Sequence, residues 1–277
     1  MAPEPVTGRV NLVVALGCEA RPLIRHFALR QQRVVGGLRV YGNNRGLSLL
    51  VSGVGKSAVA AACGYLAGLQ QQQSAEQAAW LNVGIAGHGR RAVGDGVCIN
   101  RVTDFASGRI SYPPVLVDPG APQSQLVTVD DPETVYADDA AYDMEGSVYL
   151  STVTRFVTSE LCQLFKVVSD SPDTPSHSVT ESVAAGLIES RLEAIDHLVT
   201  RLNELAADYN AIYRRPEEVS RLLERFRLTV SQQLQLDSLC RRYRALTGSR
   251  LDRQLDLNTI GSGRELIRRI EGMLPLL

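Results

Sequence analysis

Short apolar runs alternate with helix-spaced segments over the first two thirds of the chain. Residues 10–16 form a valine-rich run that ends at Gly17, a pattern typical of a strand buried on both faces. Residues 19–27 then predict a short helix, and residues 38–41 and 47–51 predict two strands around a turn rich in glycine and asparagine. This alternation predicts an α/β domain built around one sheet.

Glycine, proline and glutamine mark the expected interruptions of this pattern. The strand at residues 80–83 is predicted to be broken by Gly84, Gly87 and Gly89. The glutamine-rich stretch at residues 70–77 predicts a surface connection, and several prolines predict loops between residues 107 and 125. The other predicted elements are helices at residues 57–69 and 145–156 and strands at residues 96–102 and 163–169.

The character of the sequence changes near Ser178. Apolar residues then recur at three- to five-residue spacing as far as Leu205, which predicts one face of a long helix. Pro216 suits the start of a second helix, and two more helices are predicted around residues 236–246 and 261–274. We therefore expect an α/β domain over residues 1–206 and an all-helical extension over residues 207–277.

Composition places the chain among ordinary globular proteins. Hydrophobic residues make up 44%, charged residues 21%, and the formal net charge of −1 does not favour binding to nucleic acid or to an anionic membrane. The five cysteines are widely spaced without a C-x-x-C pair, which predicts neither a disulfide framework nor a zinc site. The sequence shows no signal-peptide pattern and no apolar run of membrane-spanning length, so we expect a cytoplasmic protein.

Three acidic residues stand at the ends of predicted strands or at the start of a helix. They are Glu19, Glu145 and Asp170. Each has an ordinary structural explanation, because carboxylates favour helix N-termini and aspartate caps turns. Ligands of α/β sheets, however, bind beyond the carboxyl ends of the strands, where Glu19 and Asp170 stand.

The segments around these acids form a more specific pattern. In chain order they are V-V-A-L-G-C-E-A-R-P-L, which contains Glu19, then S-G-V-G-K at residues 52–56, N-V-G-I-A-G at residues 82–87 with V-G-D at residues 93–95, D-M-E-G at residues 143–146, and V-S-D at residues 168–170. Together they resemble the nucleoside phosphorylase family, and in particular the methylthioadenosine/S-adenosylhomocysteine nucleosidases. The resemblance covers about residues 10–175 and does not reach the helical extension.

This resemblance implies a three-layer phosphorylase/hydrolase-like fold with a central mixed sheet. It also implies cleavage of the N-glycosidic bond of a purine nucleoside, with no cofactor and no metal. Asp170 would act as the acid at the base, Glu19 would activate water, and Glu145 would bind the ribose hydroxyls. The same motifs place five further residues at the substrate: Met144, Ser169, Ile85, Ala86 and Gly87.

Two departures from the family pattern bear on the reaction. Glu19 and Asn82 stand where phosphorylases of the family hold phosphate, which favours water over phosphate as the nucleophile. Arg21 and Arg25 lie close by, so the alternative of a phosphorylase stays open. Ile85 replaces the usual serine, and the segment that carries the aromatic residue stacked on the base is different. Candidates for that aromatic residue are Phe105, Tyr112 and Tyr136.

Three alternatives to a nucleosidase stay open at this stage. A phosphorylase would need inorganic phosphate for turnover, and a non-catalytic nucleoside-binding or interaction protein would have inherited the pocket without the reaction. A nucleic-acid module in the extension is disfavoured, because residues 191–277 carry 15 Arg against 12 acidic residues, only a mild excess. We expect the extension to be a lid or an oligomer contact, and the protein to be a homodimer or a larger homo-oligomer.

Overall fold

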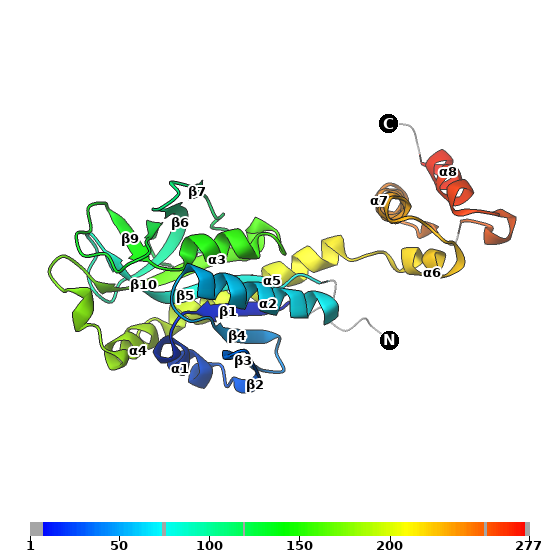
Figure 1. Cartoon of the computed structure of the whole chain (residues 1–277). Helices are drawn as coiled ribbons and strands as arrows, with labels where there is room; N and C mark the ends of the chain where they lie inside the picture. The colour runs from blue at the N-terminus through cyan, green and yellow to red at the C-terminus, as the bar shows by residue number, and fades with distance from the viewer. Residues whose placement is uncertain (1–7, 74–75, 119, 252–253, 275–277) are drawn as a thin grey trace. The chain divides into compact units, whose positions relative to one another are not determined.

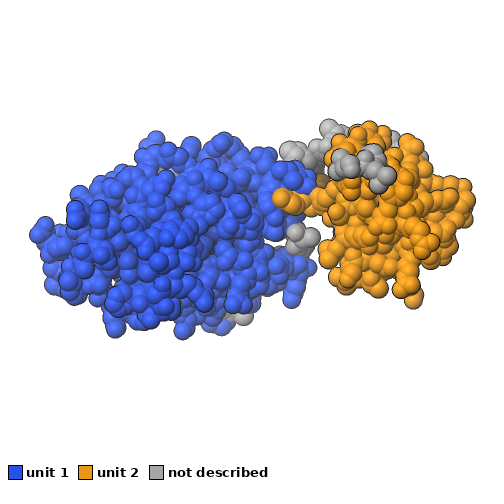
Figure 2. All heavy atoms as spheres, turned by 90° about the horizontal axis from the view of Figure 1, so that it is seen from above, with its two compact units in different colours: residues 1–212 blue, residues 213–277 orange. Residues whose placement is uncertain are grey.

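The computed structural model describes residues 8–73, 76–118, 120–251 and 254–274. The chain divides into two compact units, residues 1–212 (unit 1) and residues 213–277 (unit 2), which are coloured separately in Figure 2. The division falls at the end of helix α5 (Leu192–Tyr213).

The described residues of unit 1 form a ten-stranded mixed sheet with helices on it (Figure 1), and its first strand is buried on both faces as predicted. Leu12 and Val14 of β1 (Val10–Val14) pack in a core with Leu23 of α1 (Gly17–His26), whereas Val13 packs in a second core with Ala62 of α2 (Lys56–Gln73). The strands are β1 (Val10–Val14), β2 (Arg30–Val35), β3 (Leu38–Gly42), β4 (Leu47–Val51), β5 (Ala79–His88), β6 (Gly96–Asp104), β7 (Ile110–Ser111), β8 (Gln123–Thr128), β9 (Ala140–Asp143) and β10 (Cys162–Asp170).

Helices cover both faces of the sheet, which gives the three layers expected. Helix α2 packs beside α3, and α1 packs beside α4 (Figure 1). The strand order is β10-β6-β8-β9-β5-β1-β4-β3-β2, with β7 beside β6 and a further pairing of β10 with β5. The helices of unit 1 are α1 (Gly17–His26), α2 (Lys56–Gln73), α3 (Gly146–Val153), α4 (Glu181–Glu189) and α5, with short 3₁₀ turns at Ser159–Leu161 and Ser176–Ser178.

Three expectations about these elements were wrong. Strand β5 continues through Gly84 and Gly87 to His88, because β10 pairs with it along this stretch and supplies the hydrogen-bond ladder. Helix α2 extends to Gln73, since glutamine is a good helix former. The long C-terminal helix of unit 1 is two helices, α4 and α5, and at the break between them Arg191 donates a hydrogen bond to the carbonyl of Gly94.

Unit 2 has its own apolar core. It contains α6 (Glu217–Arg225), α7 (Val230–Thr247), a 3₁₀ turn at Leu257–Thr259 and α8 (Gly263–Met273), and Pro216 immediately precedes α6 as predicted. Its fully buried side chains include Leu222, Leu236 and Leu266. Across the described part of both units, no helix has the length and apolar character needed to cross a membrane.

Candidate active site

Three elements bring the predicted acidic residues to one cavity. Glu19 lies in the first turn of α1, directly after β1, Glu145 immediately precedes α3, and Asp170 is the last residue of β10. All three line a cavity of about 230 Å³, and so do the other predicted site residues: Met144, Ser169, Ile85, Ala86 and Gly87. Segments far apart in the sequence therefore converge on one place.

The three candidate aromatic residues differ in whether they line this cavity. Tyr136 lines the cavity and is only 6% exposed. Phe105 and Tyr112 are 72% and 69% exposed and are not among the residues that line it. Of the three candidates, Tyr136 is the one placed to meet a bound ligand, and Tyr142 on β9 joins it in the lining.

Backbone N–H groups hold Glu19 through both of its carboxylate oxygens. Oε2 accepts hydrogen bonds from the amides of Ala15 at 3.1 Å and Leu16 at 2.8 Å, and Oε1 accepts one from Ile85 at 2.9 Å. Burial raises the pKa of Glu19, although these N–H groups and the charge of Lys166 act against the rise. The side chain is fixed in orientation and holds a proton more readily than an exposed glutamate.

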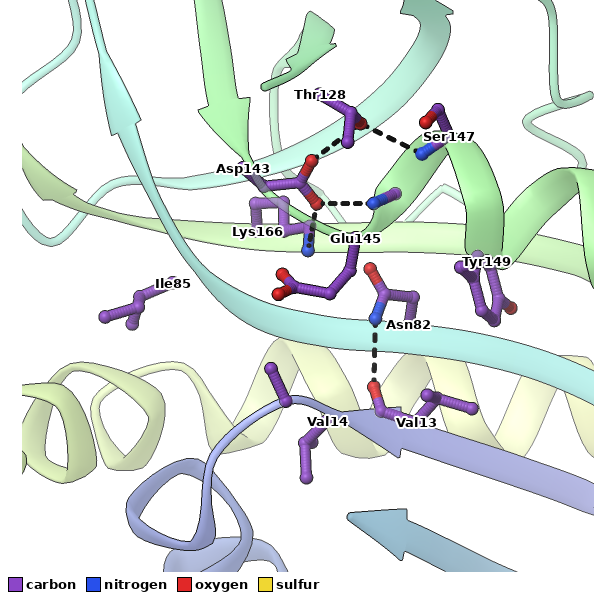
Figure 3. Close-up of polar contacts among 12 residues, drawn as sticks. Val13, Val14, Asn82, Ile85, Thr128, Asp143, Glu145, Ser147, Tyr149 and Lys166 are labelled. Atoms are coloured by element: carbon purple, nitrogen blue, oxygen red, sulfur yellow. Dashed lines mark hydrogen bonds and ion pairs between the residues drawn. The ribbon is translucent and has the colours of Figure 1, made fainter. Parts of the chain in front are cut away.

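Glu145 lies beside a buried ion pair between Lys166 and Asp143 (Figure 3). The Lys166 ammonium is 2.8 Å from Asp143 Oδ2, and both side chains are almost fully buried. Glu145 Oε1 accepts a hydrogen bond from the amide of Gly55 at 2.6 Å. Burial and the neighbouring charge of Asp143 raise the pKa of Glu145 to about 7, and Lys166 and Gly55 limit the rise.

The Asp143–Lys166 pair is held by further hydrogen bonds. Asp143 accepts from the hydroxyl of Thr128 at 2.8 Å and from the amide of Gly146 at 2.9 Å (Figure 3). Burial acts to lower the pKa of Lys166, but the charges of Asp143 and Glu145 outweigh it and raise that pKa. Lys166 is therefore a cation, and it partly balances the buried acids around it.

Asp170 is contacted by a hydroxyl at each oxygen. The hydroxyl of Ser169 donates to Oδ1 and the phenol of Tyr136 donates to Oδ2. Burial and the proximity of Asp170 raise the pKa of Tyr136, so its phenol keeps its proton at neutral pH. Gly87 faces this pair, because a methyl group at Gly87 would lie 2.5 Å from both Asp170 Oδ2 and Tyr136 Cε1.

Lys166 is the main site residue that the sequence interpretation missed. A signal was present, since it is a lysine in the otherwise apolar run L-F-K-V-V of a strand predicted to be buried. Asp143 was visible within D-M-E-G, but nothing in the local sequence pairs it with Lys166. Among the described residues, no group of three or more His, Cys, Asp or Glu side chains is placed so that it could hold a metal ion.

The fold can be compared with known proteins. Neither a family model nor a curated protein sequence matches the chain. Among solved structures, the futalosine hydrolase mutant of Helicobacter pylori matches with a TM-score of 0.56 and 12% identity, covering 70% of this chain and 99% of the hydrolase. The 5'-methylthioadenosine nucleosidase of Arabidopsis thaliana matches with a TM-score of 0.58 and 17% identity, covering 72% and 97%.

A third match is the methylthioadenosine/S-adenosylhomocysteine nucleosidase of S. pneumoniae, with a TM-score of 0.55, 18% identity, and coverage of 71% of this chain and 99% of that one. Nearly the whole of each of these proteins is matched, whereas more than a quarter of the present chain has no counterpart in them. The resemblance inferred from the sequence is thus confirmed at the level of the fold: the chain contains the fold that this hydrolase and these nucleosidases share.

Proposed function

We propose that unit 1 is a purine nucleosidase-like enzyme that hydrolyses the N-glycosidic bond of a purine nucleoside. The observation that carries the proposal is the convergence of Glu19, Glu145 and Asp170 on one cavity. The fold is that of solved nucleosidases, which adds support but does not define the substrate.

Each carboxylate suits a separate part of this reaction. Cleavage builds positive charge on the ribose and negative charge on the departing base. Asp170 in its protonated form would give its proton to the base as the glycosidic bond breaks. Glu145 would accept hydrogen bonds from the ribose hydroxyls, and its charge would favour the cationic sugar.

Glu19 would remove the proton from the attacking water. Its backbone hydrogen bonds hold the carboxylate in one orientation, and burial moves its pKa toward the neutral range in which a general base works best. Lys166 would limit the repulsion among the acids, so that Glu145 and Glu19 can be ionised in the same cavity.

The hydrogen bonds of Glu19 also support water over phosphate. A phosphate ion needs N–H donors and positive charge. The amides of Ala15, Leu16 and Ile85 already donate to Glu19, and its carboxylate would repel an anion at this place. Phosphorolysis would therefore require a different anion site.

Base release from a panel of nucleosides tests the proposal. The full chain is incubated with 5'-methylthioadenosine, S-adenosylhomocysteine, adenosine, inosine and guanosine, with and without inorganic phosphate, and the free base is measured by chromatography. We expect release of a purine base from at least one nucleoside at the same rate with and without phosphate. Release only with phosphate would identify a phosphorylase, and no release from any nucleoside would contradict the enzyme proposal.

A further inference from the structure

One aromatic side chain fills part of the cavity that a substrate would need. Tyr136 lies in the segment between β8 and β9, and its ring packs edge-on against Tyr142 with the ring centroids 5.7 Å apart. Its phenol donates to Oδ2 of Asp170. The ring also takes up the space above Gly87, where an added methyl group would lie 2.5 Å from Tyr136 Cε1.

The backbone of Tyr136 is strained in this arrangement. Its φ angle is 50°, in the left-handed region that bulky residues rarely adopt. Such strain persists only where the surroundings hold it, and it gathers at ligand sites and switch regions. The contacts that hold Tyr136 include the hydrogen bond to Asp170, the packing against Tyr142 and a hydrogen bond between its backbone and Glu133.

The size of the cavity gives a second observation. Its volume is about 230 Å³, whereas pockets for small molecules typically measure about 300–1,000 Å³. The cavity is therefore small for a nucleoside while Tyr136 stays in place. Removing the aromatic ring would enlarge the end of the cavity at which Asp170 and Gly87 lie.

We propose that Tyr136 closes the base end of the site and must move away from Asp170 before a purine base can bind there. The base then takes the place of the phenol over Gly87 and meets the Asp170 carboxyl. This inference rests on the proposed function, because it assigns Asp170 to the base. Only molecules in which Tyr136 has moved away from Asp170 can bind a base. The fraction of such molecules therefore limits the apparent affinity of the site for the base.

Binding of free bases tests the inference without depending on turnover. Adenine and hypoxanthine are titrated calorimetrically into the wild-type chain and into Tyr136→Ala, Tyr136→Phe and Tyr112→Ala. Tyr112 is the matched control, since it is exposed and does not line the cavity. If Tyr136 has moved away from Asp170 in about one tenth of the wild-type molecules, Tyr136→Ala binds a base about 10-fold more tightly than the wild type does. Tyr136→Phe, which loses only the hydrogen bond, also binds more tightly, and Tyr112→Ala binds like the wild type.

A crystal structure with a bound base tests the position of Tyr136 directly. We expect the base over Gly87 and Tyr136 away from Asp170. A bound base beside an unbroken Tyr136–Asp170 hydrogen bond overturns the inference, as do weaker binding by both Tyr136 variants and a complete lack of base binding by Tyr136→Ala. The proposed function fails separately, if no nucleoside in the panel releases its base.

Discussion

A buried lysine among buried acids links the stability of unit 1 to the chemistry of its cavity. Lys166 is 2% exposed and its ammonium lies 2.8 Å from Asp143. Removing one partner of such a pair leaves an unpaired charge away from water. We expect Lys166→Met to lower the free energy of unfolding by about 3–5 kcal/mol.

Urea unfolding followed by tryptophan fluorescence measures this loss. The chain has one tryptophan, Trp80, which is buried in β5 of unit 1. The control is the double variant Lys166→Met/Asp143→Asn, which removes both charges and should recover part of the lost stability. Equal losses in the single and the double variant would contradict the expectation that the unpaired charge of Asp143 causes the loss.

Asp170 offers a test that separates chemistry from folding. Asp170→Asn keeps the shape of the side chain, and the hydroxyls of Ser169 and Tyr136 can rotate to accept from the new amide. The amide cannot supply the proton for the base, so base release should fall about 10²- to 10⁴-fold. The exposed Asp173, exchanged for Asn, is the control and should keep full activity. Unchanged release by Asp170→Asn would remove Asp170 from the mechanism.

Glu145 predicts a pH dependence of stability. Burial and the charge of Asp143 raise its pKa to about 7 from its ordinary value of 4.5, so the folded state binds the proton more tightly than the unfolded state. The stabilising effect is complete below the unfolded pKa and is lost as the pH rises through about 7. Unit 1 should therefore lose stability from this group between pH 5 and pH 8.

The comparison with Glu145→Gln isolates this effect. Burial lowers the pKa of His88, which makes stability rise with pH and opposes the contribution of Glu145. The difference in unfolding free energy between the two proteins, followed by Trp80 fluorescence at several pH values, removes the His88 contribution. A difference that does not change between pH 5 and pH 8 would contradict the raised pKa of Glu145.

Among the elements, strand β5 shows the limits of predicting secondary structure from the local sequence. Its glycines predicted a break, because glycine weakens a strand when only neighbours in sequence are considered. In the structure β5 is continuous, and Gly84 and Gly87 instead leave space for side chains from other elements. A methyl group at Gly84 would lie 3.1 Å from Glu19 Oε1 and 3.5 Å from Lys166 Nζ.

This close approach predicts a selective effect of Gly84→Ala. The added methyl group should displace the Glu19 carboxylate and lower base release about 10- to 100-fold, because small misplacements of reacting groups are costly. Gly64→Ala is the control, since nothing lies within 4 Å of its added methyl group in α2. It should raise stability by about 0.5–1 kcal/mol and leave base release unchanged. Equal activity of both variants would show that Glu19 tolerates the displacement.

The residues around the cavity show what could and could not be predicted from the sequence. The positions of Glu19 and Asp170 at strand ends were predicted because strand ends are visible in the hydrophobic pattern, whereas their roles were inferred from the family resemblance. The Lys166–Asp143 pair and the contact of Tyr136 with Asp170 were not, because both join segments separated along the chain. Such contacts depend on strand register and on loop conformation, and neither leaves a periodic signal.

For the molecule as a whole, the question is whether unit 2 affects the cavity. All the described residues that line the cavity belong to unit 1. The core of unit 2 is formed by side chains of its own helices, among them the fully buried Leu222. The two units should therefore respond separately to changes in their cores.

Leu222→Ala tests this independence. The lost burial and the resulting cavity should destabilise unit 2 by about 2–5 kcal/mol, which is a large part of the stability of so small a unit. Helical circular dichroism should fall, whereas the unfolding midpoint reported by Trp80 and the rate of base release should stay the same. Leu234→Ala, on the 64% exposed position of α7, is the control and should change none of these. A lower Trp80 midpoint or slower base release in Leu222→Ala alone would show that unit 2 supports the cavity, and would favour the lid or oligomer role over an independent module.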